Sequence, residues 1–138
     1  MVLEIIERIK KNASGESEDC ININGVAFQL HCKWRKRVFI SISPKQPTLI
    51  ETTVSTIKKA PLMSIIVRTP QYRIQGARTK TTENLLANKF TPALLHYPFS
   101  ELRCINKNIA FTATLKKKHI IQLEKMVLYF EALLRTVK

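Results

Sequence analysis

A chain of 138 residues has the usual length of a single domain, and an apolar content of 45% is typical of folded rather than disordered proteins. Its 23 lysines and arginines exceed its 10 acids by 13, and the excess extends over most of the chain, since no acid lies between Asp19 and Glu51. Such a charge attracts polyanions, while three cysteines without a CxxC pair argue against a disulfide framework and a zinc ribbon.

The start of the chain is expected to be an appendage to the main body. Apolar residues recur there at helical spacing, at Val2, Ile5, Ile6 and Ile9. They predict an amphipathic helix within residues 1–12. Residues 13–19 are polar and contain a glycine, so they are expected to form a linker. Residues 20–138 would then form the basic α+β body of a single domain.

Alternation of apolar and polar residues predicts strands after the linker. Residues 26–30 and 38–42 alternate in this way, and the polar turn at residues 33–37 joins them into a hairpin. Residues 48–59 are compatible with either a strand or a loose helix. Further strands are predicted at residues 62–69 and 72–75, and a second hairpin at residues 103–115.

Helices are expected between and after the later strands. Thr82 is the predicted cap of a short helix, and Thr91 followed by Pro92 predicts the start of another. Residues 120–137 carry a long apolar stripe, so this helix should pack across the sheet. The element order predicts an α+β fold: an antiparallel sheet built from hairpins, a long C-terminal helix packed on one face and an N-terminal amphipathic helix.

Reactive groups are sparse in this sequence. Asp19 is the sole aspartate, and no Gly-rich phosphate motif occurs. His31 and Cys32 are neighbours on a predicted strand and would point to opposite faces, which disfavours a shared metal. No pair shows ligand spacing in the conceivable zinc set of Cys20, His31 or Cys32, Cys104 and His119. We therefore expect no metal, no cofactor and no enzymatic activity; a pocket with Glu101 or Glu51 beside a histidine would argue otherwise.

Two groups of cations are candidate anion-binding residues. The first surrounds the only tryptophan at the predicted hairpin tip, and the second follows in the next strands: Lys33, Trp34, Arg35 and Arg37, then Arg68, Arg73 and Arg78. The cations of both groups could pair with phosphates while Trp34 stacks on a base or lipid headgroup. The alternative is a solvated turn with Trp34 folded back onto the sheet.

The predicted role is electrostatic binding of a polyanion, with nucleic acid as the leading candidate. The alternative is a protein-interaction or membrane-proximal module whose cations face anionic headgroups. Exposed strands could also pair between chains and give a homo-oligomer. No signal peptide and no transmembrane run are visible, so a cytoplasmic location is expected.

Overall fold

The structure, a computed structural model, describes residues 2–45, 55–59, 72–105 and 108–137. Its helices are α1 (Val2–Lys11), α3 (Lys80–Ala87), α4 (Thr91–Leu95) and α5 (Leu123–Thr136), and a 3₁₀ helix, η1 (Lys117–Gln122), directly precedes α5. Its strands are β1 (Gly15–Ile23), β2 (Val26–Trp34), β3 (Arg37–Pro44), β4 (Ser55–Lys59), β5 (Tyr72–Gly76), β6 (Glu101–Ile105) and β7 (Asn108–Lys116). The chain is a single α+β domain, as predicted.

The strands of the described residues form one antiparallel sheet in the order β1-β2-β3-β7-β6-β4-β5. A tight turn at Asn24 and Gly25 joins β1 to β2, and both residues have the positive φ of a two-residue hairpin turn, 53° and 84°. The chain then turns at Arg35 and Lys36 into β3. Both predicted hairpins, β2 with β3 and β6 with β7, are confirmed.

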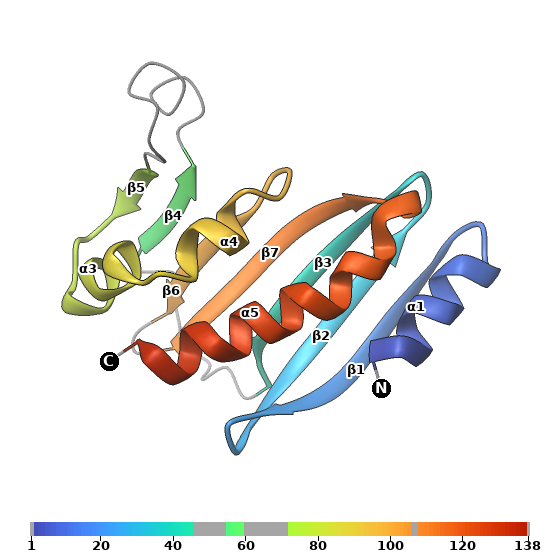
Figure 1. The fold of residues 1–138 in the computed structure, drawn as a ribbon, viewed down its shortest axis with the longest axis horizontal. Helices are drawn as coiled ribbons and strands as arrows, with labels where there is room; N and C mark the ends of the chain where they lie inside the picture. The colour runs from blue at the N-terminus through green and yellow to red at the C-terminus, as the bar shows by residue number, and fades with distance from the viewer. Residues whose placement is uncertain (1, 46–54, 60–71, 106–107, 138) are drawn as a thin grey trace.

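The helices cover one face of this sheet. Figure 1 shows α1, α4 and α5 in front of the strands. The α3 helix is tied to the same face, because Thr82 lies with its hydroxyl oxygen 2.8 Å from that of Ser55 on β4, a strand residue that points into the core. No helix of the described residues lies over the opposite face, which we call the open face.

The core fills the space between the sheet and the helices. Alternate strand residues point into it, including Phe28, Leu30 and Cys32 of β2, Ile40 and Ile42 of β3, and Phe111 and Leu115 of β7. The helix α5 adds Leu123, Met126, Phe130 and Leu133, at spacings of three and four. The centroid of the Phe130 ring lies 5.7 Å from that of Phe28, in an edge-to-face contact, and 6.2 Å from that of Phe111. Each such buried side chain contributes about 1.5–3 kcal/mol, which fixes α5 across the sheet.

The predicted linker at residues 13–19 is wrong, because residues 15–19 belong to β1. This edge strand pairs with β2 along its whole length, from Gly15 opposite Trp34 to Ile23 opposite Val26. Its inward polar side chains have partners: Arg8 of α1 donates from Nη1 to Ser17 Oγ at 2.8 Å. The polar composition therefore belongs to an edge strand with one solvent-exposed face.

Two predicted helix caps also differ from the structure. The cap of α3 is Thr79, whose hydroxyl accepts a hydrogen bond from the Thr82 amide at 3.2 Å. Thr91 does not cap α4, because its buried hydroxyl donates to the Leu85 carbonyl instead. The strand predicted at residues 62–69 lies outside the described residues. Of the ambiguous stretch at residues 48–59, residues 48–54 also lie outside them, and residues 55–59 form β4.

Candidate functional site

Two phenylalanines are exposed on or beside the open face of the sheet. Phe39 lies on β3, where its neighbours Val38 and Ile40 point into the core, and its side chain is 59% exposed. Phe99 lies in the loop between α4 and β6 and is 79% exposed. Two large apolar rings in solvent carry a hydration penalty that burial against a ligand would remove.

The loop that carries Phe99 is held in place against the sheet. The Pro98 carbonyl accepts a hydrogen bond from the Thr114 amide at 3.0 Å, and the Ser100 hydroxyl donates to the Tyr97 carbonyl at 2.7 Å. Phe99 itself has a φ of 53°, in the left-handed region that side chains other than glycine rarely adopt. Strain of this kind concentrates at binding sites, so the exposed ring is a candidate contact residue.

A groove of about 600 Å³ lies between the two rings. Its lining is mainly apolar and includes Phe39, Phe99, Arg37 and His31 together with the small residues Ser41, Thr112 and Thr114. A second groove, of about 500 Å³, lies on the other side of Phe99 and is bordered by Lys58, Lys59 and Tyr97. Phe99 therefore separates two hollows that follow one another across the strands.

Cations border the first groove. Arg37 lines it, and the cross-strand partner of Arg37 is Lys116 on β7. Lys33 is the cross-strand partner of Phe39, so it lies on the open face beside the ring. Neither Arg37 nor Lys116 forms an ion pair with a carboxylate among the described residues. These positive charges are available to an anionic ligand.

Trp34 does not lie at the surface. Its side chain is 3% exposed, and its indole Nε1–H donates to the Asn12 carbonyl at 3.1 Å. The ring packs under the start of β1, where Gly15 leaves room for it. The prediction that Trp34 stacks on a ligand is therefore wrong, and the alternative of an indole folded back onto the sheet is correct.

The cations predicted to bind an anion lie in separate parts of the structure. Lys33, Arg35 and Arg37 are exposed at one end of the β2–β3 hairpin. Arg73 is exposed on β5 and shares the open face, because the register pairs it with Lys58 and, through β4, with Glu101. Four strand spacings of about 4.8 Å separate β3 from β5, so Arg73 lies about 19 Å across the sheet from β3.

The remaining predicted cations do not join this surface within the described residues. Arg78 pairs with Glu83 at 3.1 Å, at the start of α3. Arg68 lies outside the described residues. Glu101 and His96 both line the second groove, which is the setting that would favour a catalytic site. Each side chain has another partner there, since Glu101 pairs with Lys58 at 3.2 Å and His96 Nδ1 lies 2.6 Å from the Ala93 carbonyl oxygen. Glu51 lies outside the described residues.

Sequence reasoning missed the two phenylalanines for different reasons. Phe39 had a signal, since it is a large apolar residue at the polar phase of an alternating strand. Phe99 had none, because its exposure results from a backbone conformation in a loop.

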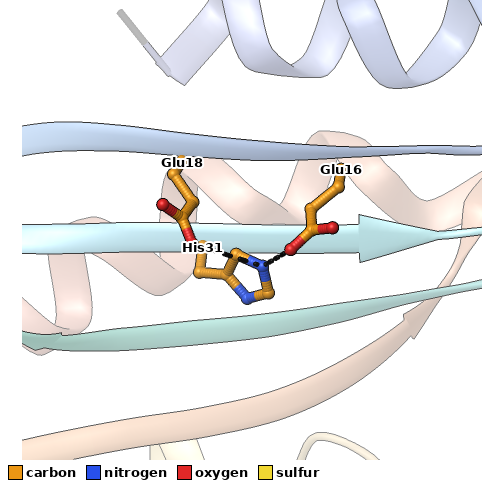
Figure 2. Close-up of side chains that lie close together, drawn as sticks. All are labelled: Glu16, Glu18 and His31. Atoms are coloured by element: carbon orange, nitrogen blue, oxygen red, sulfur yellow. Dashed lines mark hydrogen bonds and ion pairs between the residues drawn. The ribbon is translucent and has the colours of Figure 1, made fainter.

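A cluster of two glutamates and a histidine adjoins the groove on the same face, and its histidine, His31, also lines the groove. Figure 2 shows Glu16 and Glu18 reaching from β1 toward His31 on β2. The His31 Nε2 lies 2.6 Å from Glu16 Oε1 and 3.9 Å from Glu18 Oε1. The hydrogen bond from His31 lowers the pKa of the Glu16 carboxyl, and Lys33 adds a smaller effect in the same direction. The error about the linker concealed this cluster, because residues i and i+2 share a face only in a strand.

None of the described helices is long and apolar enough to cross a membrane. Within the described residues, the groove with its two phenylalanines and neighbouring cations is the surface best suited to bind a ligand. Comparisons with protein-family models, with curated proteins and with solved structures gave no significant match.

Proposed function

We propose that the protein binds single-stranded nucleic acid on the open face of its sheet. Bases stack on Phe39 and Phe99, and phosphates pair with Arg37, Lys33 and Arg35. The observation that carries the proposal is the pair of exposed rings, 59% and 79% exposed, at a groove bordered by Arg37 and Lys116 in a chain of charge +13. Neither cation has an ion-pair partner among the described residues.

Charge complementarity selects the ligand class. A neutral apolar partner would gain from the two rings but leave Arg37 and Lys116 beside it without counter-charges. A nucleic acid uses both features, since each base offers a flat face and each phosphate a negative charge. Stacking of a base on an aromatic side chain contributes about 1–3 kcal/mol, and it tolerates any base.

The form of the surface favours single strands over duplexes. In a duplex the faces of the bases are stacked on one another and cannot reach an aromatic ring. Entry into a major groove requires a protruding helix or two-stranded ribbon. Phe39 instead lies on the broad face of a sheet, within a groove that an unstacked base can enter.

The test is fluorescence anisotropy with labelled single-stranded and double-stranded oligonucleotides of about 12 nucleotides, at about 50 and about 200 mM salt. We expect tighter binding of the single strand and a marked fall in affinity with salt. Phe39→Ser and Phe99→Ser should each weaken binding by about 5–150-fold, the equivalent of one lost stacking contact, with an unchanged salt slope. Leu128→Ser, at a 58% exposed position of α5, is the matched control.

Neutralising the cations should have the complementary effect. Each of Lys33→Gln, Arg35→Gln and Arg37→Gln should reduce the salt slope by about 0.7, the value for one phosphate contact on a single strand. Lys125→Gln on α5 is the control for a lost surface charge. Absence of binding at low salt, or binding unaffected by the two serine variants, would overturn the proposal. Cosedimentation with anionic liposomes would then test the membrane-proximal alternative. The cytoplasmic location and self-association through strand edges stay predictions.

A further inference from the structure

Three metal-ligating side chains converge on the open face, close to the edge of the sheet. Glu16 and Glu18 are two residues apart on β1, so both point to this face. His31 on β2 is the cross-strand partner of Glu18. One donor atom from each of the three lies within 4.8 Å of the other two (Figure 2). The set is mixed, with an imidazole nitrogen between two carboxylates.

The spacing of these atoms is close to that of a metal centre. A tetrahedral ion with bonds of about 2.1 Å separates its ligand atoms by about 3.4 Å. The distances from His31 Nε2 are 2.6 Å to Glu16 Oε1 and 3.9 Å to Glu18 Oε1, on either side of that value. All three side chains are partly exposed, so small rotations about their bonds suffice to admit an ion.

The charge around the cluster leaves room for a cation. Neither Glu16 nor Glu18 forms an ion pair with a lysine or arginine among the described residues, although the chain has 23 of them. Lys33 lies opposite Glu16 on β2, and it lowers the pKa of that carboxyl less than the hydrogen bond from His31 does. Two carboxylates side by side on a strand repel each other, and a divalent ion would neutralise both.

We propose that Glu16, Glu18 and His31 bind a divalent transition-metal ion, with Zn²⁺ as the best match. Zinc accepts imidazole nitrogen and carboxylate oxygen together, whereas Mg²⁺ prefers oxygen ligands alone. Three protein ligands leave the fourth position of a tetrahedral ion open to water or to an anion. The proposal does not require nucleic-acid binding, because the proposed stacking and phosphate contacts use other side chains, although His31 also lines the groove.

The test is isothermal titration calorimetry of ZnCl₂ into metal-free protein, in the absence of nucleic acid. The visible absorption of bound Co²⁺ reports the coordination geometry as a second readout. The background is Cys20→Ser, because Cys20 is an exposed thiol at the next outward position of β1 and could bind zinc alone. We expect one zinc per chain in this background and a tetrahedral cobalt spectrum.

Removal of a ligand should weaken zinc binding strongly. His31→Gln, and separately the pair Glu16→Gln and Glu18→Gln, should each reduce the affinity at least about tenfold, since loss of outer partners alone has that effect. His119→Gln and Glu124→Gln, at exposed positions elsewhere, should leave it unchanged. Circular dichroism confirms that each variant is folded. Absence of zinc binding, its loss in Cys20→Ser, or equal affinity in the ligand variants would overturn the proposal.

Discussion

Replacement of Gly15 by alanine tests the packing of Trp34 directly. A Cβ at Gly15 would lie 2.6 Å from Trp34 Cζ2 and 3.0 Å from Cη2, whereas ordinary contacts are 3.4–4 Å. The indole cannot swing away freely, because it is 3% exposed and hydrogen-bonded to the Asn12 carbonyl. Gly15 does not have a positive φ in the glycine range, so the backbone itself accepts alanine. The expected penalty is therefore steric.

The magnitude follows from two opposing effects. Insertion of extra atoms into a well-packed site costs about 1–3 kcal/mol. Alanine also lowers the conformational entropy of the unfolded chain, which stabilises the fold by about 0.4–1 kcal/mol. We expect Gly15→Ala to lower the free energy of unfolding by about 1–2 kcal/mol. Urea denaturation followed by circular dichroism measures this as a lower midpoint with an unchanged m value.

A double-mutant cycle isolates the contact. Trp34→Phe removes the outer ring atoms that the new methyl group would meet, so Gly15→Ala should cost much less in that background. Gly25→Ala is the control: its cost arises from a φ of 84° and not from a neighbour, so it should be the same in both backgrounds. Equal costs of Gly15→Ala with and without the tryptophan would refute the packing of the indole against β1.

Four further outcomes are expected. Burial raises the pKa of the Cys32 thiol to about 12. At pH 8 this thiol should therefore react with a thiol reagent about 1,000-fold more slowly than a thiol with a pKa of about 9, because only the thiolate reacts. The exposed Cys20 should react readily. The same shift stabilises the fold below pH 9, and the contribution should decline as the pH rises toward 12. Thr79→Ala should lower stability by about 1 kcal/mol in thermal unfolding, through loss of the α3 cap. Phe130→Ala should cost about 3–5 kcal/mol in urea denaturation, against less than about 0.5 for Leu128→Ala on the exposed side of the same helix.

Much of the fold could be predicted from the sequence, whereas little of the site could. The apolar stripe of residues 120–137 and the alternation at residues 26–42 depend on neighbours along the chain, and the structure confirms both a C-terminal helix and a β2–β3 hairpin there. The start of the first strand was missed because its inner side chains there, Ser17 and Asp19, are polar. Ser17 is buried there, and its hydroxyl accepts a hydrogen bond from Arg8 of α1, a contact between separate elements.

The sequence by itself determined which residues share a face within each strand or helix, because the periods of 2 and 3.6 are properties of the local backbone. It did not determine which face of the sheet the helices would cover. That choice depends on the packing of α1 and α5 against the strands, and it left Phe39 in solvent. Tertiary structure alone also buried Trp34 against Gly15 and brought Glu16 beside His31, because both pairings require β1 to add to the edge of the sheet.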